Sequence, residues 1–202
     1  MPWLERIPHR ALWGPMAYHG VGAPKIKKME VHILRLSHRA ARDKRVTTHL
    51  GLVARAFGAT KMLVTGAKDE HLTNSIQRVV DSWGGPFEVE FVTGWMKLIE
   101  DYKRRGFTIA HLTMYGLPIQ ENIGKIRESD KILAVLGGEK VPSEVYQLAD
   151  YNIAVTSQPH SEISALAGFW DRLFGGEELS KRFQNARQEV IPQARSKQVL
   201  KR

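Results

Sequence analysis

Short apolar runs alternate with amphipathic stretches through most of this chain of 202 residues, and this alternation limits the possible folds more than any other feature. Patterns typical of buried strands occur in EVHILRL (30–36), KMLVTG (61–66) and KILAVLGG (131–138). Between them, apolar residues recur at helical spacing in TTHLGLVARAFG (47–58) and EHLTNSIQRVVDSW (70–83). The alternation predicts an α/β fold, with a mostly parallel sheet flanked by helices. Further strands are predicted in FEVEFV (87–92), TIAHLTMYG (108–116) and YNIAV (151–155), and further helices in GWMKLIEDYKRR (94–105), PIQENIGKIRES (118–129), PSEVYQLAD (142–150) and the residues from Pro159 onward.

The chain is expected to have three parts. Residues 1–28 show no sustained periodicity and form a basic N-terminal extension before the first strand pattern. Residues 29–176 hold all the predicted strands and form the folded domain. From residue 177 to 202 the composition is polar and basic, which predicts a helical or disordered tail.

The net charge of +9 is concentrated at the two ends. Residues 1–28 hold five Lys/Arg and one acidic residue, and residues 177–202 hold seven Lys/Arg and three acidic residues. Basic ends on a nearly neutral body are typical of proteins that bind nucleic acid, because each phosphate contact releases counterions. The alternative is that both ends are only solvated and partly disordered.

Several classes of protein are excluded by what the sequence lacks. The chain has no cysteine, so disulfides, thiol catalysis and cysteine-bound metals are excluded, and an intracellular, cytoplasmic location is expected. No apolar run reaches the roughly 18 residues that span a membrane, and the first 20 residues lack the apolar core of a secretory signal. No histidine pair has the i, i+4 spacing of a zinc site, so no metal is expected.

Ligands of open parallel sheets bind at the carboxyl ends of the strands, which here selects four loops. The two glycines of LGGEKVP (136–142) let a ligand approach the backbone closely, although a tight strand–helix turn is the alternative. The pair matches neither G-x-G-x-x-G nor a Walker loop, which disfavours a dinucleotide or nucleoside triphosphate. In VTSQPHS (155–161), the polar residues either bind a ligand or begin a helix, with Gln158 or Ser161 as the N-cap and Pro159 at the first position. The other two loops are LTMYGLP (112–118) and RLSHRAARDKR (35–45).

The loop after the first strand is strongly basic. On the following helix, Arg45 and Arg55 lie on the face opposite the apolar stripe that includes Leu50. Such donors on one face suit phosphate recognition, and a solvated basic face is the alternative. The basic cluster consists of Arg35, His38, Arg39, Arg42, Lys44, Arg45 and His49.

Four segments together resemble the archaeal tRNA cytidine-56 2′-O-methyltransferases of the SPOUT superfamily, which use S-adenosylmethionine. They are LRLSHRAARDKRVTTHLGLVARAFGA (34–59), HLTMYG (111–116), LGGEKVPSEVYQLADYNIAV (136–155) and TSQPHSEISALAGF (156–169). The resemblance covers residues 29–174. It implies methylation of a ribose 2′-hydroxyl in tRNA, a C-terminal deep trefoil knot and a homodimer. The apolar face of the last helix of the domain suits either a dimer interface or the core.

The resemblance also implies where the cofactor lies. Three loops of the knot are expected to wrap S-adenosylmethionine, through backbone groups, hydroxyls and an amide. The cofactor-binding residues carried over by position are Leu112, Gly137, Gly138, Glu139, Lys140, Val141, Val155, Thr156, Ser157, Gln158, Pro159, His160 and Ser161.

The catalytic residue cannot be carried over by position, because the chain departs from related enzymes. The arginine that the wider superfamily is thought to use on its first helix falls on Leu52 here. Three neighbours on the same helix, Arg45, Arg55 and His49, are the candidates for contacting the target phosphate and assisting deprotonation. Contacts with RNA are expected from Arg35, His38, Arg39, Arg42 and Lys44.

Two other functions stay open at this point. A non-catalytic RNA-binding protein of the same fold would keep the basic ends without binding the cofactor. A nucleotide-dependent oxidoreductase on a doubly wound sheet is disfavoured by the missing glycine fingerprint.

Overall fold

A single parallel sheet forms the centre of the computed structural model, which describes residues 29–138 and 140–202 but not the side chain of Lys44. The predicted extension 1–28 therefore lies outside the described residues. The strands of the sheet are β1 (Glu30–His38), β2 (Lys61–Gly66), β3 (Glu88–Val92), β4 (Thr108–Pro118), β5 (Lys131–Leu136) and β6 (Tyr151–Ala154). Their order is β3-β2-β1-β5-β4-β6, and all neighbouring strands are parallel, which confirms the predicted α/β fold.

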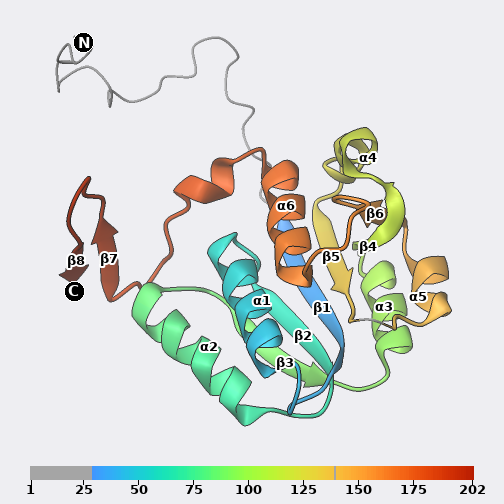
Figure 1. The fold of residues 1–202 in the computed structure, drawn as a ribbon, viewed down its shortest axis with the longest axis horizontal. Helices are drawn as coiled ribbons and strands as arrows, with labels where there is room; N and C mark the ends of the chain where they lie inside the picture. The colour runs from blue at the N-terminus through green and yellow to red at the C-terminus, as the bar shows by residue number, and fades with distance from the viewer. Residues whose placement is uncertain (1–28, 139) are drawn as a thin grey trace, which may run out of the picture.

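Helices cover both faces of the sheet (Figure 1). One core packs the first face against Leu50, Leu72, Ile126 and Phe169. These residues come from α1 (Lys44–Ala56), α2 (Glu70–Trp83), α4 (Ile119–Ile126) and α6 (Glu162–Phe174). The second core packs the other face against α3 (Trp95–Arg104) and α5 (Ser143–Leu148). Both faces of β1, β5 and β4 are thus buried, which explains their nearly continuous apolar sequences.

Most element ends fall within three residues of the sequence-based prediction, and side-chain caps explain where α2 and α6 start. At α2, the Asp69 carboxylate accepts hydrogen bonds from the backbone N–H groups of His71 and Leu72. The helix predicted to begin near Pro159 begins at Glu162 instead. Ser161 is its N-cap, and its hydroxyl accepts from the N–H of Ser164 at 3.2 Å.

Strand β4 contains an excursion of four residues. Leu112 and Leu117 both pair with Ile153 of β6, so residues 113–116 are looped out between two pairings to one residue. Gly116 presses against the β6 backbone, because a Cβ atom there would lie 2.5 Å from the carbonyl group of Asn152. The excursion, called the β4 bulge below, is therefore tied to β6 at both ends.

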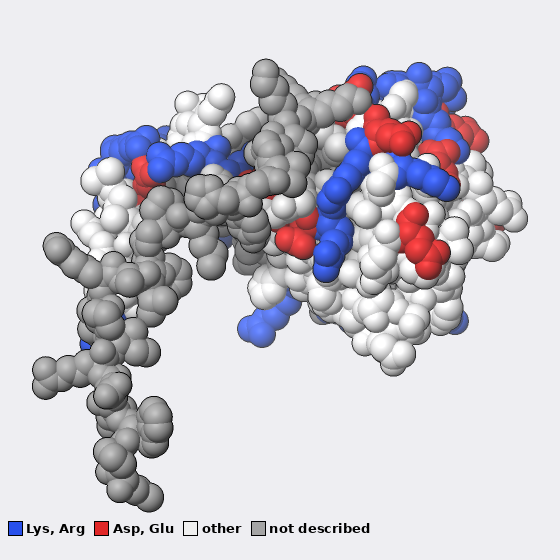
Figure 2. Space-filling view, turned by 90° about the horizontal axis from the view of Figure 1, so that it is seen from above, with Lys and Arg blue, Asp and Glu red and all other residues white. Residues whose placement is uncertain are grey.

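The C-terminal segment is not the helical or disordered tail that its composition predicts. A 3₁₀ turn (η1, Glu177–Ser180) leads to an antiparallel hairpin of β7 (Gln188–Ile191) and β8 (Gln198–Lys201). Figure 1 shows this hairpin at the side of the domain, beyond α2. Lys and Arg side chains gather at that end of the molecule in the face shown in Figure 2. In the part of the chain described, no helix has both the length and the apolar character to cross a membrane.

Candidate active site

A cavity of about 410 Å³ lies at the carboxyl ends of β4, β5 and β6. Its walls come from the β4 bulge, the loop after β5, the loop after β6 and the first turns of α6. The lining is mostly apolar, with a few polar groups that converge on one space. It consists of His111, Leu112, Thr113, Met114, Tyr115, Leu136, Gly137, Gly138, Val141, Tyr146, Ile153, Val155, Pro159, His160, Ser161, Glu162 and Ala165.

The structure brings together most of the residues predicted to bind the cofactor. Eight of them line the cavity: Leu112, Gly137, Gly138, Val141, Val155, Pro159, His160 and Ser161. Four others, Lys140, Thr156, Ser157 and Gln158, are not part of its wall, and Glu139 lies outside the described residues. The Thr156 hydroxyl accepts from the backbone N–H of Gln158 at 3.2 Å, so this part of the loop forms its own turn.

The two glycines after β5 differ in the space around them. A Cβ atom on Gly137 would lie 2.3 Å from the Val141 side chain, so the loop closes tightly on itself there. Gly138 has room for a Cβ atom, which would lie 3.7 Å from the Arg35 guanidinium. The Gly138 backbone is therefore open toward the cavity and has a buried arginine beside it.

Arg35, at the end of β1, is 2% exposed and connects β1 to the wall of the cavity. Its guanidinium lies 3.3 Å from the Glu162 carboxylate and donates to the carbonyl of Leu36 at 3.1 Å. Such burial does not fit the expected contact with RNA. The ion pair instead fixes Glu162, the first residue of α6, at the edge of the cavity.

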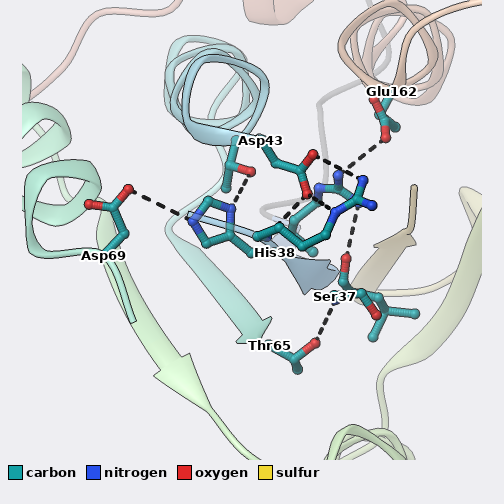
Figure 3. A network of polar contacts seen from close by, with 10 residues as sticks. Ser37, His38, Asp43, Thr65, Asp69 and Glu162 are labelled. Atoms are coloured by element: carbon teal, nitrogen blue, oxygen red, sulfur yellow. Dashed lines mark hydrogen bonds and ion pairs between the residues drawn. The ribbon is translucent and has the colours of Figure 1, made fainter. Parts of the chain in front are cut away.

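The turn from β1 into α1 is held by a polar network (Figure 3). Ser37 has a left-handed backbone (φ +57°), and its N–H donates to the Thr65 hydroxyl at 2.9 Å. His38 is buried between the Thr47 hydroxyl at 2.9 Å and the Asp69 carboxylate at 3.8 Å. Burial lowers the pKa of His38, although the Asp69 charge opposes the shift. Like Arg35, His38 is placed to support the fold rather than to contact RNA as predicted.

The rest of the basic cluster is nearer the surface. Arg39 donates to the Asp43 carboxylate from its backbone N–H and from its guanidinium, at 3.1–3.2 Å. These hydrogen bonds lower the pKa of Asp43. Arg42, Arg45 and His49 are exposed. Since Arg45 and His49 are four residues apart in the first turns of α1, they share one face at the edge of the sheet that holds the cavity.

Arg55 does not fit the catalytic role predicted for it. It is 7% exposed and lies at the end of α1, which is the opposite edge of the sheet. Its guanidinium donates to the carbonyls of Trp83 and Gly84 at the end of α2, with distances of 2.5–3.0 Å. It also lies 4.4 Å from the ring centre of Phe183 in the C-terminal segment. Helical periodicity could not reveal this contact, because the partners come from distant segments.

A chain of hydrogen bonds supports the cavity wall, and the sequence alone does not predict it. His111 is bonded to the Asn152 side chain at 2.8 Å, and Asn152 donates to the carbonyl of Tyr146 at 2.9 Å. The Tyr146 hydroxyl in turn bonds to the Thr113 hydroxyl at 3.1 Å. Burial lowers the pKa of His111, with the Asn152 hydrogen bond opposing the shift. The available signal was a histidine inside a strand pattern, which alone does not identify its partners.

Metal-ligand chemistry is not evident at this site. Among residues 29–138 and 140–202, no group of three or more His, Asp or Glu side chains is placed to hold a metal ion. The polar groups that line the cavity are backbone groups, hydroxyls, imidazoles and the Glu162 carboxylate.

Solved structures of SpoU-type methyltransferases share the fold. A TrmH/SpoU tRNA modifying enzyme of A. aeolicus superposes with a TM-score of 0.53 at 14% identity, over 77% of this chain and 80% of that chain. The SpoU methyltransferase AviRb from Streptomyces viridochromogenes, in complex with the cofactor AdoMet, gives 0.54 at 13% identity, over 79% and 61%. This likeness supports a SPOUT-type arrangement of strands and helices.

Sequence relatives are much closer. The tRNA (cytidine(56)-2′-O)-methyltransferase of Thermococcus kodakarensis is 51% identical over 179 residues, which cover 87% of this chain and 98% of that protein. The enzyme of the same name from Methanothrix thermoacetophila is 53% identical over 174 residues, with coverage of 86% and 99%. The family described as tRNA ribose 2′-O-methyltransferase, aTrm56, matches residues 83–200, more than half of the chain. The chain belongs to this family of tRNA ribose 2′-O-methyltransferases.

Proposed function

We propose that this protein transfers a methyl group from S-adenosylmethionine to the ribose 2′-hydroxyl of cytidine 56 in tRNA. Family membership supports the reaction class, and the names of the relatives supply the nucleotide. The observation on this chain that carries the proposal is the cavity, because it joins three loops that are far apart in the sequence and were each predicted to bind the cofactor.

The residues of the cavity fit S-adenosylmethionine. A volume of about 410 Å³ lies in the range of small-molecule sites. Apolar walls formed by Leu112, Val141 and Val155 suit an adenine ring, and the backbone at Gly138 can approach the ligand without a side chain between them. When bound, S-adenosylmethionine supplies an electrophilic methyl group on a positively charged sulfur.

The polar residues around the cavity have separate roles in this proposal. Arg35 holds the Glu162 carboxylate at the cavity edge, where the carboxylate lone pairs not used by the ion pair accept hydrogen bonds from the ligand. Arg45 binds the phosphate next to the target ribose, because it is an exposed arginine in the first turn of α1. The 2′-hydroxyl is a weak nucleophile, so it must be aligned with the methyl group and lose its proton to a nearby group. His49, one turn after Arg45, is the candidate proton acceptor.

The deep trefoil knot is also part of the proposal. Its support is the β4 bulge, since Gly116 crosses directly against the backbone of β6 and the chain continues from β6 into α6. A homodimer is proposed as well. In this structure α6 uses its apolar face in the core of its own domain, through residues such as Phe169 and Trp170. Exposed apolar residues elsewhere, including Val199 and Leu200 of the hairpin, are then available for a partner.

Methyl transfer to an unmodified tRNA transcript tests the function. The experiment uses labelled S-adenosylmethionine and maps the 2′-O-methyl group along the RNA. We expect incorporation at cytidine 56, and a transcript with deoxycytidine at that position serves as the control because it lacks the acceptor hydroxyl. Absence of S-adenosylmethionine binding in calorimetry would instead support a non-catalytic RNA-binding protein. Cytoplasmic location, where tRNA is present, follows from the proposed substrate.

A further inference from the structure

We propose that Tyr115 forms a stacking platform for the base of the methylated nucleotide, so that the β4 bulge binds substrate RNA as well as bordering the cofactor. The inference rests on the proposed function. Tyr115 lines the cavity, yet it is 78% exposed, the highest value among the large hydrophobic side chains of the described residues. An exposed aromatic ring at the rim of a ligand cavity is a ready surface for a second, planar ligand.

The backbone that carries Tyr115 is firmly anchored. Residues 113–116 are fixed at both ends by pairing to Ile153, and Gly116 lies against the Asn152 backbone. Inside the bulge, the Thr113 hydroxyl bonds to the Tyr146 hydroxyl at 3.1 Å and accepts from the Tyr115 N–H at 3.4 Å. The ring therefore projects from a fixed support, which reduces the entropy lost when a base stacks on it.

The geometry of a nucleotide places its base near this ring. In a ribonucleotide, the base is attached to the ribose carbon next to the one that carries the 2′-hydroxyl. If the hydroxyl reaches a methyl group held in the cavity, the base must lie within one nucleoside of the cavity edge. Single-stranded and extruded bases are commonly held by aromatic stacking. Of the two exposed rings in this cavity wall, Tyr115 and His160, Tyr115 is the larger.

Two other partners could lie against the Tyr115 ring, and each would give a different experimental result. The ring could stack on the adenine of the cofactor, in which case its loss would weaken S-adenosylmethionine binding. It could also pack against a second copy of the chain, in which case its loss would change the oligomeric state. The neighbouring Leu117 provides a matched control, since it is 61% exposed on the same strand but does not line the cavity.

The first experiment compares Tyr115→Ala, Tyr115→Phe and Leu117→Ala with the wild type. We expect Tyr115→Ala to lose about tenfold or more in kcat/KM for tRNA, the effect of one lost base–aromatic stack. Tyr115→Phe keeps the ring and should stay within about twofold of the wild type, as should Leu117→Ala. The dissociation constant for S-adenosylmethionine and the mass in light scattering should not change. An equal loss in Leu117→Ala, weaker cofactor binding or altered mass would each overturn the inference.

A second experiment varies the RNA instead of the protein. A tRNA with an abasic ribose at position 56 keeps the acceptor hydroxyl but has no base to stack. Wild-type enzyme should lose about tenfold on this substrate, whereas Tyr115→Ala should lose little more than it already has. If Tyr115→Ala reduces kcat/KM by the same factor on both RNAs, the ring does not act through the base. If wild-type enzyme methylates neither RNA, the proposed function fails, and the two failures are thus distinguished.

Discussion

At the start of α1, Arg45 and His49 are exposed on the edge of the sheet that carries the cavity, whereas at its end Arg55 is buried on the opposite edge. Arg55 is surrounded by the end of α2 and by Phe183, so its charge is used to join three segments. Two arginines of one helix therefore have different roles, one available to a ligand and one structural. Along α1, the edge of the sheet beside which an arginine lies, and not its helical face, decides whether that arginine is exposed or buried.

The largest expected effect is on stability and concerns Arg55. Replacing it with alanine leaves the buried carbonyl of Gly84 and the partly buried carbonyl of Trp83 without their donors, which should lower the free energy of unfolding by about 3 kcal/mol. Chemical denaturation measures the change. Arg45→Ala is the matched control and should stay within about 0.5 kcal/mol of the wild type, since Arg45 is an exposed residue of the same helix. Equal stability of the two variants would remove the contrast between the helix ends.

The second effect is on activity and concerns the other end of the helix. If Arg45 contacts the target phosphate and His49 accepts the proton, alanine at either position should lower kcat by about a hundredfold, with cofactor affinity unchanged. Arg55→Ala, assayed below its unfolding temperature, should keep its kcat. Full activity in both Arg45→Ala and His49→Ala would end the proposal that the start of α1 takes part in catalysis.

A smaller effect tests the aromatic partner of Arg55. Phe183→Ala removes both the cation–π contact, at 4.4 Å, and the partly buried ring, and should lower the free energy of unfolding by about 1–2 kcal/mol. Phe183→Leu keeps an apolar side chain without the π face, so it should lose about half as much. Identical losses in the two variants would show that the ring contributes no more than apolar contact.

The contrast between the two edges also shows which features of the fold and of the site can be predicted from the sequence. The periodicity located every strand of the sheet and every α-helix, and β2 and α2 match to the residue, because their patterns depend on residues close in sequence. The cavity loops could be chosen because carboxyl ends of parallel strands share one edge. The knot and the dimer were predicted only from the family resemblance. The pattern of strands and helices does not by itself predict either of them.

Burial of charged residues was the part that the sequence did not reveal. Arg35 and His38 were expected to face RNA, but both are buried. Arg35 still pairs in register with both neighbouring strands, and His38 follows a bulge in β1 at which Ser37 has a left-handed conformation. Their partners, Glu162 and Asp69, lie far along the chain. The C-terminal hairpin was missed for a related reason. Its strands have four residues each, with β7 only partly buried and β8 exposed, so they lack the apolar pattern that identifies strands of a core.

The smallest expected effect is a pH dependence of folding stability. It again compares the two edges of the sheet, through two buried histidines. His111 supports the cavity wall, and His32 lies near the start of β1, where it bonds to Tyr102. Burial lowers the pKa of both below the ordinary value of about 6.5. As the pH falls through that value, the unfolded chain binds a proton that the folded chain does not, so the folded protein loses stability.

The environments of these two histidines predict unequal contributions to this loss. Each histidine can contribute at most about 1.4 kcal/mol per pH unit. The Glu30 carboxylate, 3.4 Å from His32, opposes the lowered pKa, whereas His111 has only the neutral Asn152 amide to oppose it. His111→Asn should therefore flatten the dependence of unfolding free energy on pH between 7 and 5 more than His32→Asn does. The slope, taken from urea denaturation at several pH values, is the readout, because a variant can lose overall stability without changing it. A larger change of slope in His32→Asn would reverse this assignment and place the acid-sensitive group away from the cavity.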